Sequence, residues 1–541
     1  MSLGKAPKQE EMYRSSRDFC EERLVETSVY RLLAKECHRL FPDERFADLF
    51  QDVGRRSVPP RIVAVVMVLQ RLEGLSDREA VDRFAFDLRW KYAAGGLDLE
   101  YPGFVHTVLV DMRARLRDSK MPDRIFEAVL EVARAAGHIG RKRVLDSTAL
   151  YDAVATQDTV TLIRSALRGL LRVVESGLAS ELRAVLKRDD DYLEAGKPLC
   201  DWDDKAAREE LIDALAKDAH AALALLDGRT LADETKRAAE LLATVVGQDL
   251  EQTQDGRFRI AWRVAADRVI STVDPEARHG HKTAARGFDG YKGHISVDPD
   301  SELIVATAVT AGNVADGAAA KELLEEIFAV AAPAEAAPEP KPSPVQAEAA
   351  AEPAAVEVYG DASYGTAEIL EHLEAVGAEA NVKVQQPSAR EGIFTKAEFA
   401  VDLKAGTVRC PAGMVATIRP SAAGGGKASF GASCKTCPLH SKCTNSKNGR
   451  SINVHPKEAI LERHRQQQRD PQWKAKYRGT RPKVERKFGH LMRHRHGGRR
   501  ARMRGRRRIG DDFALLAAGI NLKRMAVLTH RAAKSVRAEQ R

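Results

Sequence analysis

The densest basic tract of this chain surrounds a single carboxylate, Glu485. Between Trp473 and Arg508 the sequence has sixteen Lys or Arg residues and one acidic residue. The tract contributes +15 to a chain of 541 residues whose total charge is +9, so the remainder carries −6. Sixteen cations in one segment repel one another unless a polyanion lies close by. The tract therefore predicts contact with nucleic acid, and its lone carboxylate is a candidate ligand for a divalent metal.

Two further carboxylates lie in contexts typical of an α/β sheet. Asp146 is in KRVLDSTAL, which predicts a short buried strand, and Asp361 ends the strand predicted by VEVYGDASYG. Together with Glu485 they could meet at one point. Two divalent ions about 3.5–4 Å apart need bridging carboxylates, because hard cations prefer oxygen ligands. The residue types alone leave ordinary roles open: a strand-end cap, a turn residue, and an ion-pair partner for Arg481.

Four cysteines form a cluster in a Gly-rich stretch. The spacing is Cys434-x2-Cys437-x5-Cys443, with Cys410 upstream. Four thiolates suffice for tetrahedral Zn²⁺. The sequence therefore predicts a possible structural zinc site, and a metal-free structural loop is the alternative.

Several cations are candidates for binding DNA phosphates. Guanidinium groups grip phosphate bidentately, which favours arginine in this role. In the basic loop around His279, the residues His281 and Lys282 could contact phosphate or be solvated. The predicted DNA-binding set is Arg481, Arg493, Arg499, Arg500, Arg502, Arg504 and Lys292.

Residues 1–135 are predicted to form a helical N-terminal domain for DNA binding or assembly. Apolar residues recur from Ile62 to Leu72, Gly74 interrupts the pattern, and Ser76 with Glu79 forms a capping box. This is the helix-turn-helix pattern. From the residues alone, the second helix either contacts DNA or belongs to a packed helical hairpin.

The remaining chain predicts one α/β domain, residues 136–528, with three interruptions. Strands are expected near 142–150, 259–271, 356–361 and 379–386, and a helix near 366–376. Residues 290–298 and 303–312 are expected to form an antiparallel hairpin with a turn at Pro299 and Asp300. Residues 155–258 read as a helical insertion, 331–355 as a flexible Ala/Pro/Glu loop, and 395–455 as an irregular Cys-rich insertion. Residues 529–541 form a basic tail.

The composition is that of a soluble globular protein. The longest apolar run, Ile62–Leu69, is too short to span a bilayer, and the N-terminal residues lack the apolar core of a secretory signal. We therefore expect a cytoplasmic protein without membrane contact. Seven cysteines in a chain of this size do not predict a disulfide framework.

The local contexts of the three carboxylates resemble the DDE transposases of bacterial insertion sequences. LDSTAL resembles the first-Asp motif of that family and VYGDASYG the second. Arg481 and Glu485 match the spacing of its Tyr, Arg, Glu, Lys signature, with Tyr477 one residue further away than usual. At the Lys position this chain has Met492, followed by Arg493. The resemblance extends over roughly residues 40–528, including STVDPEARHGHKTAARGFDGYKGH and the Cys-containing insertion.

The resemblance implies a fold, an activity and partners. It implies a ribonuclease-H-like core, a mixed sheet flanked by helices, in which Asp146, Asp361 and Glu485 hold Mg²⁺ or Mn²⁺. Such an enzyme binds the terminal inverted repeats of its own element, cleaves the double-stranded DNA and joins the 3′ ends to target DNA. It acts as a homodimer or higher oligomer at the bacterial nucleoid. Two alternatives stay open: a catalytically silent DNA-binding descendant, and a zinc-dependent binding module.

Overall fold

The computed structural model of the chain describes residues 15–51, 54, 56–152, 155–194, 196–263, 265–283, 285–329, 355–422 and 424–539. All but the last residue of the Ala/Pro/Glu loop expected at 331–355 lies outside the described residues. In the described part of the chain, no helix is long and apolar enough to cross a membrane.

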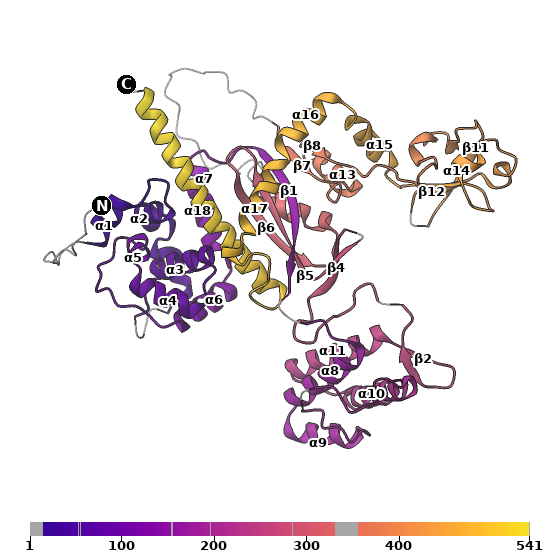
Figure 1. The fold of residues 1–541 in the computed structure, drawn as a ribbon, viewed down its shortest axis with the longest axis horizontal. Coiled ribbons are helices and arrows are strands. Elements are labelled where there is room, and N and C mark those ends of the chain that lie inside the picture. The colour runs from indigo at the N-terminus through magenta and orange to yellow at the C-terminus, as the bar shows by residue number, and fades with distance from the viewer. Residues whose placement is uncertain are drawn as a thin grey trace, which may run out of the picture.

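A mixed sheet forms the centre of the molecule (Figure 1). Its strands follow the order β4-β5-β1-β7-β8, and β6 pairs with the same edge of β5 as β4 does. The pairs β1–β7 and β7–β8 are parallel, and the others are antiparallel. The bounds are β1 Lys142–Tyr151, β4 Arg278–Thr283, β5 Arg286–Asp298, β6 Leu303–Ala311, β7 Glu357–Gly360 and β8 Glu379–Val382. A mixed sheet flanked by helices agrees with the expected ribonuclease-H-like class.

Helices connect or follow most strands of this sheet along the chain. A short turn of 3-10 helix, η2 (Asp316–Ala319), leads into α12 (Ala320–Ala329), and α13 (Ala367–Ala375) connects β7 to β8. The C-terminal part is helical: α15 Glu458–Gln467, α16 Pro471–Thr480, α17 Pro482–Leu491, η5 His494–His496 and α18 Arg506–Glu539.

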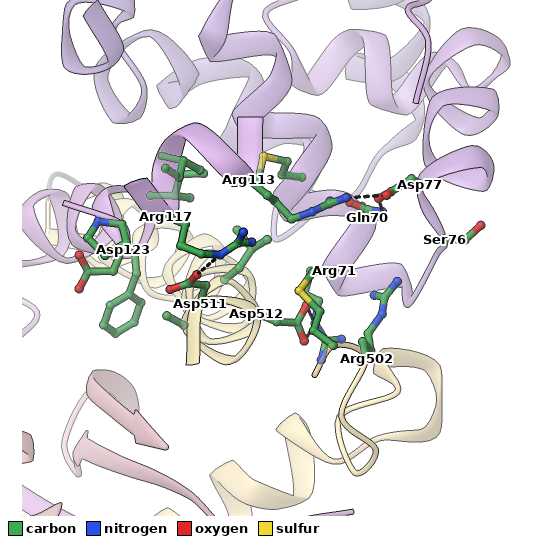
Figure 2. Close-up of a pocket in the computed structure, with 18 residues that line it drawn as sticks. Gln70, Arg71, Ser76, Asp77, Arg113, Arg117, Asp123, Arg502, Asp511 and Asp512 are labelled. Atoms are coloured by element: carbon green, nitrogen blue, oxygen red, sulfur yellow. Dashed lines mark hydrogen bonds and ion pairs between the residues drawn. The ribbon is translucent and has the colours of Figure 1, made fainter. Parts of the chain in front are cut away.

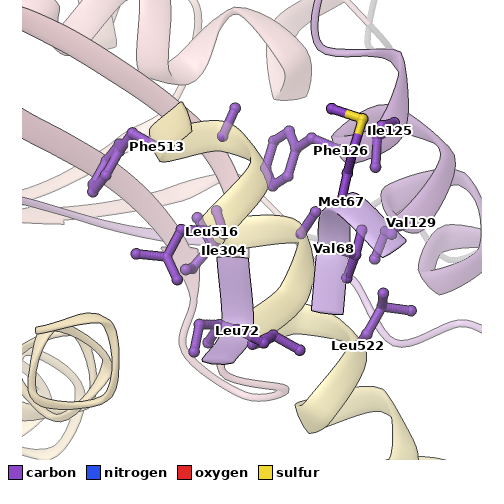
Figure 3. Close-up of a cluster of buried hydrophobic side chains, with 14 of the residues drawn as sticks. Met67, Val68, Leu72, Ile125, Phe126, Val129, Ile304, Phe513, Leu516 and Leu522 are labelled. Carbon is purple, nitrogen blue, oxygen red and sulfur yellow. The ribbon is translucent and has the colours of Figure 1, made fainter. Parts of the chain in front are cut away.

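The N-terminal helices share one hydrophobic core with the sheet. α18 packs on α3 and α7 with one side and on β6 with another (Figure 3). All residues of α3 from Ile62 to Leu72 are buried, because helices surround it. The capping box predicted at Ser76 and Glu79 is present. These elements are α1 Ser16–Arg23, α2 Val29–Leu40, η1 Asp43–Leu49, α3 Pro60–Glu73, α4 Asp77–Phe86, α5 Leu88–Ala93, α6 Thr107–Asp118 and α7 Arg124–Ala135.

The helical insertion follows β1 and has a core of its own. It consists of α8 Thr159–Val173, α9 Ser176–Val185, α10 Lys205–Leu226, α11 Asp233–Asp249 and a hairpin of β2 Leu250–Gln252 and β3 Phe258–Ile260. The strand expected at 259–271 is wrong beyond Ile260, where the chain is irregular as it returns to the sheet. β4, which follows, continues along β5 from the end of β6.

The Cys-rich stretch forms a small sheet rather than the expected irregular loop. Five antiparallel strands follow the order β13-β12-β11-β10-β9 around a separate apolar cluster. Figure 1 shows this unit beyond α15, away from the central sheet. Its elements are η3 Lys396–Glu398, β9 Ala400–Asp402, β10 Thr407–Arg409, β11 Val415–Pro420, β12 Gly426–Ser429, η4 Gly431–Cys434, α14 His440–Cys443 and β13 Ser451–Val454.

Candidate active site

The sheet register places two of the predicted carboxylates side by side. β1 and β7 are parallel, with Lys142 opposite Glu357 and Val144 opposite Tyr359. Extending this register by two residues brings Asp146 opposite Asp361. Asp146 lies within β1, whereas Asp361 comes directly after β7, so the first side chain is more buried than the second.

Helical spacing brings the third carboxylate to the same place. Trp473, Tyr477, Arg481 and Glu485 follow one another at intervals of four, which puts them on one side of consecutive helical turns. α16 carries the first two, α17 carries Glu485, and Arg481 joins the helices just before Pro482. α17 packs against β1. Tyr477 comes four residues before Arg481, one residue more than in the family signature. This interval of about one helical turn keeps Tyr477 on the same side of the helices as Arg481 and Glu485.

Arg481 lies among all three carboxylates. Its Nη2 is 3.0 Å from Asp146 Oδ1 and 4.0 Å from Asp361 Oδ2, and its Nη1 is 3.7 Å from Glu485 Oε1. The Arg481 side chain is only 8% exposed, and its Nε and Nη1 have no hydrogen-bond acceptor among the described residues. One cation thus faces three acids without satisfying all of its own donors. It was predicted to bind DNA, and here its charge faces the carboxylates.

Burial dominates the electrostatics of this cluster. It raises the pKa of Asp146 to about 6; the Arg481 guanidinium opposes this shift, and the Asp361 charge adds to it. Beneath the site, the imidazole of His294 lies 3.1 Å from the Tyr364 hydroxyl and 2.9 Å from Thr310 Oγ1. Burial lowers the pKa of His294 to about 4, so the ring is neutral and structural at neutral pH.

The three carboxylates open into a cavity of about 610 Å³ that also contains a residue pair missed by the sequence analysis. Asp316 accepts a hydrogen bond from Ser147 Oγ at 2.6 Å and pairs with Lys292 Nζ at 2.8 Å. Lys292 also donates to the Val314 carbonyl. Lys292 was predicted to bind DNA, yet its ammonium is held by groups of the protein. Asp316 comes 24 residues after Lys292 in the sequence. The two side chains are brought together only by the pairing of β5 with β6.

His281 and Lys282 of β4 also line this cavity. Neither side chain has an ion pair among the described residues, and both are exposed. The register of β4 against β5 shifts between His281 and Thr283. Such irregularities re-aim side chains. The basic loop noted in the sequence therefore lines the same cavity as the carboxylates.

The predicted basic residues after α17 divide into two groups. The backbone of 499–501 bonds to both sides of Tyr151 at the end of β1, which anchors Arg499 and Arg500 there. The Arg502 guanidinium instead donates to the Leu75 carbonyl in the turn before α4. Four of the five predicted side chains are exposed and have no protein partner in the described part of the chain: Arg493, Arg499, Arg500 and Arg504.

The N-terminal helices are docked on this region through ion pairs whose residues line a cavity of about 250 Å³ (Figure 2). Arg71 of α3 contacts Asp512 of α18 at 3.0 Å and donates to the His496 carbonyl. Arg117 lies 3.5 Å from Asp511. The exposed positions of α4 are Arg78, Glu79, Asp82 and Phe86, with more acidic than basic groups. The helix-turn-helix is formed, and DNA contact by its second helix stays a prediction.

The four cysteines line one small cavity in the Cys-rich sheet, beside His440. Cys443 is buried, and Cys410 and Cys434 pack against the same apolar cluster. Over the described ranges, no three His, Cys, Asp or Glu side chains stand in an arrangement ready to hold a metal. In the acid cluster, Arg481 lies between the carboxylates.

Two parts of the chain match known protein families. Residues 19–115, from α1 into α6, match a family described as Transposase domain (DUF772). Residues 409–526 match a family described as Transposase DDE domain, which includes Glu485 and the basic tract. Asp146 and Asp361 lie outside both matched ranges. No curated protein and no solved structure matches the chain.

Proposed function

This chain belongs to the DDE transposases of insertion sequences, and from this we propose that it binds the ends of its own element, cleaves the DNA there and joins the 3′ ends to target DNA. The catalytic residues in this proposal are Asp146, Asp361 and Glu485. The observation that supports it best is the contact of one cation, Arg481, with all three carboxylates. Side chains from two strands and a helix converge there.

The strand arrangement supports a ribonuclease-H-like catalytic core. The first Asp lies on the strand between an antiparallel and a parallel neighbour, and the second follows that parallel neighbour. The Glu-bearing helix packs on the first strand.

The donor set fits divalent Mg²⁺ or Mn²⁺, because it consists of carboxylate oxygens already gathered around a positive charge. Bound there, such ions would activate a water or a 3′-hydroxyl and stabilise the leaving oxygen. Asp146, Asp361 and Glu485 would be the ligands, and Arg481 would have to turn away from them. Its two unpartnered donors make that movement less costly than for a fully bonded arginine. Once turned, the guanidinium is available for a DNA phosphate.

Double-stranded DNA is the proposed partner, and Arg493, Arg499, Arg500 and Arg504 are the proposed phosphate contacts outside the cavity. They are exposed cations on the segment that runs past the end of β1. Phosphate contacts fix the register of a protein on DNA without reading its sequence. A homodimer or higher oligomer on DNA, in the cytoplasm at the nucleoid, belongs to the same proposal.

We also propose that Cys410, Cys434, Cys437 and Cys443 bind one structural Zn²⁺. The support is that all four line one cavity although Cys410 is 24 residues from the next cysteine. Purified protein should then carry about one zinc per chain, and Cys434→Ser with Cys437→Ser should release it and loosen residues 400–450. Metal analysis of the wild type that finds no zinc would contradict this site.

The main proposal is tested by a DNA strand-cleavage assay on the DNA that flanks the reading frame. We expect inverted repeats on both sides, and Mg²⁺-dependent nicking of a duplex that carries one of them. EDTA should abolish the nick and leave binding intact. Binding without nicking under any divalent metal would instead identify a catalytically silent descendant, in which Arg481 permanently neutralises the acids.

A further inference from the structure

A second open cavity adjoins the carboxylates from the other side. It measures about 650 Å³ and shares Asp361, Arg481 and Glu485 with the cavity described above. The carboxylate cluster therefore forms the wall between two open spaces. Apart from these shared residues, the second cavity is lined by no acidic side chain.

Four exposed cations line this second cavity: Lys383, Arg469, Lys474 and Arg478. None of them has a side-chain ion pair or side-chain hydrogen bond to the protein, as far as the structure describes the chain; Lys383 lies over the Tyr477 ring, 4.8 Å from its centroid. Lys474 and Arg478 are one helical turn apart on α16, so they project in nearly the same direction. We call this set the basic cavity.

Neighbouring cations outside the basic cavity are paired. Lys476, also on α16, contacts Glu379 at 2.8 Å and Glu357 at 3.2 Å. On α15, Arg463 contacts Glu374 at 2.7 Å and Arg465 contacts Glu458 at 2.9 Å. In this short stretch of sequence, the cations outside the cavity are thus paired with carboxylates, whereas the four cations of the basic cavity have no carboxylate partner among the described residues. Unpaired cations that converge on one cavity indicate an anionic ligand.

Buried hydrogen-bond donors line the same space. Trp473 and Tyr477 stack with ring centroids 5.0 Å apart, and Trp473 is 7% exposed. The Trp473 indole N–H and the Gln468 amide nitrogen are buried without an acceptor among the described residues. A buried donor without a partner costs free energy, so an acceptor from a ligand is expected there. Phosphate oxygens are acceptors only, and they match a lining of donors and cations.

We infer that the basic cavity binds backbone phosphates of a DNA strand, on the side of the reacting bond opposite His281 and Lys282. This inference rests on the proposed function, because a strand whose phosphodiester reaches the carboxylates must continue into both cavities. Lys282 and His281 line the first cavity, and Lys474 and Arg478 line the second. The two sets would hold the phosphates that precede and follow the scissile bond.

Salt-dependent binding tests the inference without requiring cleavage. The measurement is fluorescence anisotropy of an element-end duplex in EDTA at several salt concentrations. Lys474→Ala with Arg478→Ala should make the slope of log K against log salt shallower by about 0.9 per contact, or about 1.8 in total. The control is Lys476→Ala with Arg463→Ala, which also removes two positive charges, both of them in ion pairs, and should leave the slope nearly unchanged. Equal slope changes in the two double variants would overturn the inference.

Ethylation interference then locates the contacts. Phosphates whose ethylation no longer weakens binding in the Lys474→Ala, Arg478→Ala variant should lie on one side of the scissile bond, and those lost in Lys282→Ala on the other. Loss at the same phosphates in both variants would contradict the opposite placement. A wild-type protein that binds DNA with the predicted salt slopes and never nicks it would contradict the proposed activity. The inference that the basic cavity binds DNA phosphates would still hold.

Discussion

Two buried arginines of this molecule face carboxylates in very different ways. Arg71, 4% exposed, binds Asp512 through Nε at 3.0 Å and donates Nη1 to the His496 carbonyl. Arg481, 8% exposed, has one contact of hydrogen-bond length, to Asp146, and longer contacts of 3.7 and 4.0 Å to two other acids. Two of its donor groups have no acceptor within the described residues. We call the first arginine saturated because none of its nitrogens is both buried and without an acceptor within the described residues, and the second unsaturated.

Their surroundings differ in the same sense. Arg71 and Asp512 line a smaller cavity of about 250 Å³ (Figure 2). The interface beside it is closely packed, since a Cβ on Gly519 would lie 2.6 Å from the Leu72 side chain and one on Gly74 would lie 2.3 Å from the Arg495 carbonyl oxygen. Arg481 lies between two open cavities. A saturated arginine therefore joins parts of the fold, whereas an unsaturated one between two larger open cavities is available for a ligand.

The largest effect is expected from the carboxylates around Arg481. Asp146→Asn, Asp361→Asn and Glu485→Gln should each lower the rate of strand cleavage by on the order of a thousandfold or more, because metal ligands supply several kcal/mol of transition-state stabilisation. Binding to element-end DNA should persist. Glu368→Gln, an exposed acid on α13, is the control. Cleavage within tenfold of wild type in any of the three would remove that residue from the site.

Removal of the saturated arginine should cost stability instead. Arg71→Ala leaves the partly buried Asp512 without its partner and should lower the free energy of unfolding by about 3 kcal/mol, the low end for a buried pair. Urea denaturation measures this, with the exposed Arg78→Ala as control. A loss no larger than that of the control would show that the pair does not hold the N-terminal helices on α18.

Metal should compensate for the loss of one arginine and not the other. Arg481→Gln leaves the carboxylates facing one another, so its melting temperature in EDTA should fall below that of wild type. Mn²⁺ should restore it, because a divalent ion replaces the missing charge. Arg71→Ala should show no such recovery. Failure of Mn²⁺ to stabilise the Arg481 variant more than wild type would break the contrast.

The smallest effect concerns pH at the docking interface. The buried His496 imidazole bonds to the Leu72 carbonyl, and burial with the nearby cations Arg71, Arg495 and Lys523 lowers its pKa to about 4. The ring is neutral in the folded state and charges at 6.5 when unfolded. Its contribution is therefore complete above pH 6.5 and is lost as the pH falls toward 4. His496→Asn should flatten stability against pH in that window, whereas the exposed His281→Asn should not.

The sequence predicted the acid cluster better than its surroundings. Asp146, Asp361 and Glu485 were identifiable because each motif is local, and the sheet register then brings the first two together. Charge partners were not identifiable in the same way. Arg481 and Lys292 were predicted to bind DNA, and only contacts across strands and helices show that they face Asp146 and Asp316.

The irregular appearance of residues 395–455 was misleading for a related reason. Strands of three to six residues, such as β10 and β12, are too short for a clear alternation of buried and exposed positions. Likewise, the sequence alone does not distinguish the unpaired Lys474 from the paired Lys476. The difference arises because Lys476 contacts Glu379, which lies on β8.

Mn²⁺ binding, measured by isothermal titration calorimetry, tests the central claim most directly. The comparison is between the wild type and a variant with Asp146→Asn, Asp361→Asn and Glu485→Gln together. The account predicts saturable binding in the wild type that is absent from the triple variant, while both keep a cooperative unfolding transition. Identical isotherms for the two proteins would contradict the claim that these carboxylates hold the metal.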